Sequence, residues 1–227
     1  MPLFSPLDLF ALVWFLGAWV AYSVTLRLTG KRRRGLNSEM NGYRDVWMLQ
    51  MLGREMRMVD AQIVAALQNG TAFFASTSLI AVGGALTLMR STDEILEVIG
   101  ALPFGIRTTS VQWEAKTIGL AIIFVYAFFK FAWSYRLYNY VAIMVGATPP
   151  ARDKDTPEAT AHAERTGRLC AVAGLHFNRG QRAFFFALGY LGWFISPWLL
   201  MATSVVVAVV LWRRQFVGDS HHALIGT

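Results

Sequence analysis

A long stretch without charged residues begins at Gln62 and continues to Met89, and the next charge is Arg90. A helix needs roughly 20 residues to cross a hydrocarbon core of about 30 Å, so this stretch can span a bilayer. The segment before it, residues 37–62, is charged and rich in methionine, and no proline separates the two parts. The pattern predicts one nearly continuous helix that passes from water into lipid, with a membrane span at about residues 64–89.

The composition of the whole chain agrees with a membrane protein. The chain has 227 residues, of which 55% are hydrophobic and only 15% are charged, and its mean hydropathy is +0.42. A soluble domain carries nearer a quarter of charged residues. The sequence therefore predicts an all-α membrane protein that forms a single domain over residues 1–227.

Three further apolar runs predict the remaining spans, at about residues 9–28, 117–138 and 183–212. The last run contains Ser196-Pro197, where we expect a kink, because proline cannot continue the helical hydrogen-bond ladder. The architecture expected is a four-transmembrane-helix bundle with cytoplasmic or interfacial amphipathic helices in the loops 29–62 and 139–182.

Basic residues predict the orientation of these spans. Cations are concentrated in the loops 29–62 and 139–182 and are sparse between the second and third spans, so the two long loops are expected in the cytoplasm. Both termini then lie in the periplasm of a bacterial inner membrane, and Arg213 and Arg214 are the contrary observation.

A run of four cations directly follows the first span: Lys31, Arg32, Arg33 and Arg34. Such a run stops translocation and attracts anionic lipid headgroups, at roughly 1 kcal/mol for each residue. The run is short, adjoins the membrane and lacks any recognition motif, so a nucleic-acid partner is not expected.

The methionine-rich segment 38–62 predicts an interfacial or cytoplasmic helix with one shared side, made of Met48, Met51, Leu52, Glu55 and Val59. We expect this side to pack on the second cytoplasmic loop of the protein itself; the alternative is a docking face for a partner. In the following span, Thr77 and Ala85 belong to a row of small residues that permits close helix approach.

That row places the second span inside the bundle or at a subunit interface. The alternative is that polar side chains of the same helix line a water-filled path; these are Gln68, Asn69, Thr71 and Ser78.

Lys130 is the one basic residue well inside a span, and a buried charge in lipid is a functional candidate because its burial is costly. It lies about 10 Å from the cytoplasmic end of its helix, level with Gln68 and Asn69. The simpler interpretation is a lysine that extends to the headgroups. The sharper hypothesis is a polar layer near the cytoplasmic surface, made of Arg57, Asp60, Gln62, Asn69, Lys130, Arg136, His176 and Arg182.

The sequence offers no known catalytic or cofactor motif. A phosphate-binding loop, the HExxH zinc motif and a Ser-His-Asp set are absent, and none of the four histidines lies mid-span. Cys170 is the only cysteine, which excludes an internal disulfide. No catalytic residue, metal or cofactor is therefore expected.

Several runs of the sequence resemble a known family: NGYRDVWM from Asn41, RMVDAQI from Arg57, NGTAFFASTSL from Asn69 and HFNRGQRAFFF from His176. The resemblance is to the bacterial and plant membrane proteins known as domain of unknown function 599. It implies a four-span inner-membrane protein and brings no established activity. The family-like positions are Arg57, Asp60, Gln62, Asn69, Ser76, His176, Gly180 and Arg182.

Two classes of function follow from these observations. The first is a non-enzymatic membrane protein that self-associates or belongs to a larger complex and contacts anionic lipids. The second is an oligomeric channel or transporter for an ion or small solute. Four spans make a thin bundle, so both classes favour an oligomer. An enzyme acting on lipid or quinone is supported only by His176 and Arg182 near headgroup depth.

Overall fold

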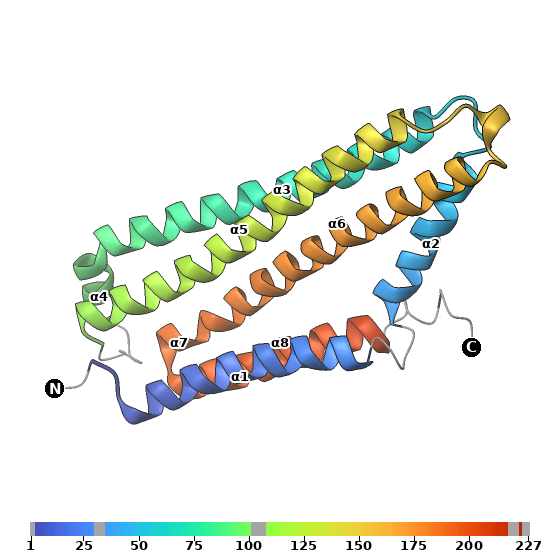
Figure 1. Ribbon diagram of the computed structural model, residues 1–227. Coiled ribbons are helices and arrows are strands. Elements are labelled where there is room, and N and C mark those ends of the chain that lie inside the picture. The colour runs from blue at the N-terminus through green and yellow to red at the C-terminus, as the bar shows by residue number, and fades with distance from the viewer. Residues whose placement is uncertain (1–2, 30–34, 101–107, 218–222, 224–227) are drawn as a thin grey trace. The chain divides into compact units, whose positions relative to one another are not determined.

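The computed structural model describes residues 3–29, 35–100, 108–217 and 223 (Figure 1). The elements of these residues are all helical, which confirms the predicted all-α class. In chain order they are α1 (Pro6–Thr29), α2 (Leu36–Met51), α3 (Met58–Arg90), α4 (Thr92–Gly100), α5 (Ser110–Gly146), the short 3-10 helix η1 (Ala151–Asp153), α6 (Pro157–Tyr190), α7 (Gly192–Ile195) and α8 (Pro197–Phe216).

Four of the described helices are long and apolar enough to cross a membrane, in agreement with the predicted class. They lie at Pro6–Leu26, Met58–Arg90, Ser110–Gly146 and Pro197–Phe216. The helix α3 has 33 residues and α5 has 37. At 1.5 Å per residue they are about 50 Å and about 55 Å long, so both extend well beyond a 30 Å hydrocarbon core.

The predicted continuous helix from residue 37 to residue 89 is divided in the structure, because α2 ends at Met51 and α3 begins at Met58. A turn over residues 52–57 separates them. In it, the backbone N–H groups of Gly53 and Arg54 donate to carbonyls three residues back, at 3.2 Å and 3.1 Å. Gly53 interrupts the ladder, since glycine favours turns over helix interiors.

The run 183–212 also differs from the expected kinked span, because α8 turns back along the end of α6 (Figure 1). Thr203 Oγ1 donates to the carbonyl oxygen of Gly189 at 2.7 Å, and the Arg214 guanidinium lies 5.5 Å from the ring centroid of Phe185. Ser196 is extended at φ −161° and ψ 155°, as a residue before proline prefers. The proline therefore marks a helical hairpin.

The chain divides into two compact units, each described here by itself. Unit 1 comprises Met1–Arg33, Thr77–Ala127 and Gln181–Arg214, and unit 2 comprises Arg34–Ser76, Phe128–Gly180 and Gln215–Thr227. The helices α3, α5 and α6 each contribute to both units.

Unit 1 is built on an aromatic cluster between α1 and the end of α6. Phe15 is fully buried, and its ring meets Phe186 edge-on at 5.8 Å and Tyr190 at 5.4 Å. Trp19 stacks on Phe186 at 5.3 Å with an angle of 5° between the rings. Aromatic pairs of this kind contribute beyond their buried area, and they align α1 with α6.

The start of α1 is fixed within unit 1 by a buried lysine and a tryptophan. Lys116 is 7% exposed and donates to the carbonyl oxygen of Trp193 at 2.9 Å. The indole N–H of Trp193 donates to Asp8 at 2.9 Å. Lys116 and Trp193 thus join the beginnings of α1 and α5 to α7.

Unit 2 has an apolar core in which α2 lies on α5 and α6. Met48 and Met51 are fully buried there with residues of α5 and α6, among them Val141 and Cys170. Ser134 donates to the carbonyl oxygen of Ala173 at 2.8 Å. This confirms that the methionine side of α2 packs on the second predicted cytoplasmic loop of the chain itself.

Candidate functional site

Asp60 lies at the corner between α2 and α3 and is fully buried. Its Oδ1 accepts a hydrogen bond from the indole N–H of Trp47 at 2.7 Å and forms an ion pair with Arg54. Its Oδ2 has no partner among the described residues. The carboxylate therefore holds the turn between two helices, and a single cation balances its charge.

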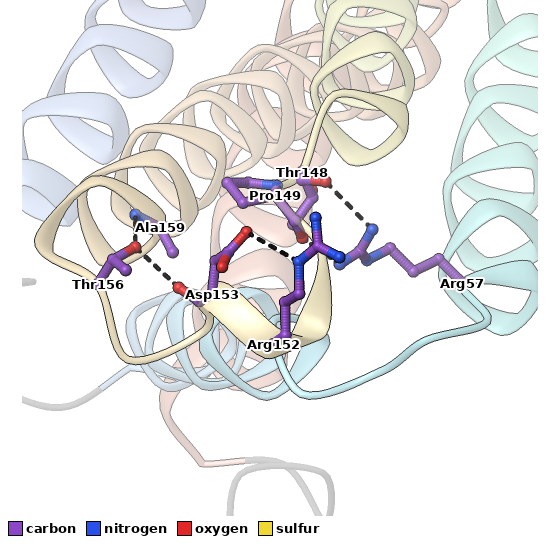
Figure 2. A network of polar contacts seen from close by, with 7 residues as sticks. All are labelled: Arg57, Thr148, Pro149, Arg152, Asp153, Thr156 and Ala159. Carbon is purple, nitrogen blue, oxygen red and sulfur yellow. Dashed lines mark hydrogen bonds and ion pairs between the residues drawn. The ribbon is translucent and has the colours of Figure 1, made fainter.

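Arg57 binds backbone carbonyls rather than a carboxylate (Figure 2). Its two terminal nitrogens donate to the carbonyl oxygens of Pro149 at 2.6 Å and Thr148 at 3.2 Å. These carbonyls follow the C-terminus of α5, where unsatisfied oxygens and the negative end of the helix dipole attract a cation. Arg57 thus ties the start of α3 to the end of α5.

The same loop is ordered by its own polar contacts (Figure 2). Thr156 caps α6: its Oγ1 accepts from the backbone N–H of Ala159 at 3.3 Å and donates to the carbonyl oxygen of Asp153 at 2.7 Å. Arg152 lies 3.8 Å from the Asp153 carboxylate. Threonine is a favoured cap because its oxygen satisfies a free N–H of the first turn.

The polar residues of α3 do not share one face. Gln68 donates to Asn139 Oδ1 on α5 at 2.6 Å, and Thr71 donates to the carbonyl of Leu67 at 2.7 Å. Gln62 and Asn69 are exposed. The side chains suggested to line one path are therefore divided between the interior of the chain and its outer surface.

Lys130 has His176 of α6 as a neighbour. Burial lowers the pKa of His176 below its ordinary value, and the positive charges of Lys130 and Arg179 lower the pKa further. His176 is therefore neutral at pH 7. Its ring lies 6.4 Å from that of Trp133, so basic and aromatic groups gather where α5 meets α6.

The two remaining predicted site residues lie elsewhere. Arg136 Nε donates to the hydroxyl of Tyr140 at 2.8 Å, one turn further along α5. Arg182 belongs to unit 1, where it is within electrostatic reach of Tyr22. Within unit 2, the contacts thus bring together Lys130 and His176 of the candidate polar layer, while Arg136 has a partner on its own helix.

The pairings themselves were not predicted. Trp47 and Arg54 hold Asp60, and Asp8 and Lys116 meet at Trp193. The partners come from separate helices or turns, and their positions in the sequence follow no known motif. The run Lys31 to Arg34, predicted to bind headgroups, lies outside the described residues.

The polar contacts described above hold helices together rather than presenting reactive groups. Among the residues that the structure describes, no group of three His, Cys, Asp or Glu side chains is placed to hold a metal. Cys170 is fully buried, and burial raises the pKa of its thiol. At neutral pH this thiol is protonated, which makes it a poor nucleophile.

Fold and contacts together define a multi-pass α-helical membrane protein. The family model described as "Protein of unknown function, DUF599" matches residues 10–220. The chain belongs to this family, as its sequence runs indicated. Neither the curated proteins nor the solved structures contain a match to the chain.

Proposed function

We propose that this protein is a non-enzymatic component of the bacterial inner membrane that self-associates through the outward face of α3. The observation that carries the proposal is a row of polar and small residues on that face: Gln62, Asn69, Ser76 and Gly83, all exposed.

The helix α3 packs on the rest of the chain through only a narrow strip of buried side chains. The buried side chains Val64, Thr71, Ser78 and Ala85 recur every seven residues. Only 11% of the apolar part of α3 is buried, against 17% for α1 and for α8 and 44% for α5. Each residue turns a helix by about 100°, so Asn69 lies about 200° from Thr71, on the opposite side.

An outward amide in an apolar helix needs a partner. Lipid tails cannot accept or donate hydrogen bonds, whereas a second helix satisfies an Asn side chain and packs closely against glycine. At Gly83 and Gly84 an added Cβ would meet nothing within 4 Å. A second copy of α3 presents the same amide and the same open glycines, so a symmetric pairing satisfies both chains.

We expect Gly83→Leu and Asn69→Leu to convert the detergent-extracted particle from an oligomer to a monomer. Leucine at residue 83 fits the isolated chain and blocks close approach of a partner. The readout is the particle mass by native mass spectrometry and light scattering. Gly17→Leu is the matched control, because Gly17 lies on α1 and an added Cβ there also meets nothing within 4 Å.

A wild-type particle that is strictly monomeric in mild detergent would contradict self-association. An unchanged mass in both α3 variants would move the interface to another face. The second candidate function is an oligomeric channel. If several copies of the chain form a ring, the row from Gln62 to Gly83 would border a central path. Ion flux into proteoliposomes that disappears in Asn69→Leu while the particle stays oligomeric would select the channel.

We also propose an orientation that revises the expectation of two periplasmic termini. In unit 1, α1 begins beside Trp193 through Asp8, and α8 begins a few residues after Trp193 and turns back along α6. The helices α1 and α8 therefore run in the same direction. Opposite sides for the two termini require an odd number of crossings, so this proposal makes α6, a helix of 34 residues that is not among the four candidate spans, a fifth crossing. The positive-inside rule places the cations after α1 in the cytoplasm, and Arg213 and Arg214 at the end of α8 then agree with it.

A fluorescent reporter that folds only in the cytoplasm should therefore be active at Thr227, and alkaline phosphatase, which needs the periplasm, should be active before Met1. The matched controls are the fluorescent reporter before Met1 and alkaline phosphatase at Thr227, and both should be inactive. If alkaline phosphatase is active at Thr227 and the fluorescent reporter at the same position is inactive, the C-terminus is periplasmic. That result would contradict the proposed orientation and agree with the prediction of two periplasmic termini.

A further inference from the structure

We propose that unit 1 contains a binding site for one anionic phospholipid, in an apolar groove between α1 and α8. The groove encloses ≈ 330 Å³. Its walls include Ala18, Ala21 and Tyr22 from α1, and Val205, Ala208 and Trp212 from α8.

The groove exists because short side chains face each other across the two helices. Ala18 and Ala21 on α1, and Ala208 on α8, leave a gap that longer side chains would close. From Ala18 to Thr25, another lining residue, α1 rises by about 10 Å. The lining is almost entirely apolar, which suits a hydrocarbon chain and does not suit a hydrated ion or a polar solute.

Cations lie at the end of the groove that follows Tyr22 and Trp212. The guanidinium groups of Arg182 and Arg214 are both within electrostatic reach of the Tyr22 hydroxyl. Arg214 is held over the ring of Phe185 at 5.5 Å. Arg213 and Arg214 are both exposed, and the ring contact gives Arg214 a preferred position.

An anionic phospholipid matches both parts of this site. Its phosphodiester accepts bidentate hydrogen bonds from a guanidinium and a further bond from a hydroxyl, while its acyl chain fills an apolar groove. A free phosphate would use only the charged end, and a neutral lipid would use only the groove. Tyr22 lines the groove and is within electrostatic reach of both arginines, so it joins the two halves of the site.

The site differs from the attraction expected of the run Lys31 to Arg34. A polybasic run draws any anionic surface through its summed charge and falls off with salt. The groove instead selects a single molecule by shape and charge together. The inference does not depend on self-association, since all the residues it uses belong to one unit of one chain.

The experiment is native mass spectrometry of the full chain after reconstitution into vesicles that contain phosphatidylglycerol and phosphatidylethanolamine in equal amounts. We expect the wild type to retain one phosphatidylglycerol. Arg214→Gln should lower the retained fraction about tenfold or more, because a hydrogen bond to a charged group is lost. Arg213→Gln removes the same charge one residue away and should retain lipid as the wild type does.

A second pair of variants tests the groove. Ala208→Leu fills it and should also abolish retention, while Ala202→Leu, on an exposed position of the same helix, should not. If Ala208→Leu does not fold, Ala18→Leu fills the groove from the opposite wall. Retention of phosphatidylglycerol by a folded groove-filling variant would overturn the proposal.

Three other results would also overturn it. If Arg213→Gln and Arg214→Gln lose lipid retention equally, the lipid is held by general attraction to the basic helix end and not by Arg214 in particular. Equal retention of both lipids would show a groove without headgroup selection. A fall in particle mass in Ala208→Leu, with lipid retention unchanged, would show that a second copy of the chain covers the groove.

Discussion

Replacing Arg54 by Met should destabilise the folded protein by about 2–4 kcal/mol at neutral pH. The side chain of Asp60 is 0% exposed, whereas that of Arg54 is 38% exposed. Removing the cation leaves a buried carboxylate with only the indole N–H of Trp47 as a donor. Breaking a buried pair in this way typically costs 3–5 kcal/mol, and we expect a loss about 1 kcal/mol smaller because water reaches the arginine side.

The double variant Arg54→Met with Asp60→Asn should recover most of this loss. Asparagine keeps an acceptor for Trp47 and removes the charge that lacked a partner, so the second substitution costs less in the absence of Arg54 than in its presence. The measurement is equilibrium unfolding in mixed detergent micelles, followed by tryptophan fluorescence. Additive losses in the double variant would contradict a charge-pairing role for Arg54.

The positions of three of the four membrane helices, α1, α3 and α5, could be predicted because hydropathy reports burial in lipid directly; the fourth predicted span, 183–212, was wrong, since it contains the end of α6 and the reversal into α8. The lengths of α3 and α5 could not be predicted from hydropathy. Beyond the hydrocarbon, a helix ends where its packing ends, and α5 continues to Gly146 because Val141 and Val145 belong to the core of unit 2. Residues 139–145 contain neither glycine nor proline, so the sequence holds no signal that would end the helix at the membrane boundary, before Gly146.

The difference at Pro197 has a similar cause. A proline in an apolar run is compatible with either a kink or a reversal, and local sequence does not separate them. The reversal depends on close approach: at Gly192 an added Cβ would lie 2.9 Å from Thr203 Oγ1 and 3.0 Å from the carbonyl of Leu199. These contacts of Gly192 are visible only once α8 is placed against α7.

The polar layer illustrates a further limit of sequence reasoning. Depth along a helix suggested that Lys130 and Asn69 are level, but depth says nothing about the direction in which a side chain points. Asn69 lies on the outward side of α3, and the charge of Lys130 acts on His176 of α6. The partners of these polar residues depend on helix rotation, which depth along the helix does not give.

Gly180→Ala should destabilise unit 2 by about 1–3 kcal/mol, against the usual preference for alanine in a helix. Alanine ordinarily gains about 1 kcal/mol over glycine in a helix interior. Here an added Cβ would lie 2.7 Å from Cε1 of Phe131. That ring is fully buried, and Phe74 and Phe177 hold it at 5.4 Å and 5.6 Å. The ring has nowhere to move, so α5 and α6 must separate.

The matched control is Gly70→Ala on α3, where an added Cβ meets nothing within 4 Å; it should be neutral or stabilising by up to about 1 kcal/mol. Phe131→Leu should rescue Gly180→Ala in part, because the smaller side chain frees the space that the new methyl group requires. All variants are compared by the same unfolding measurement. If Gly180→Ala proves as stable as Gly70→Ala, then α5 and α6 do not approach as closely at Phe131 as the structure places them.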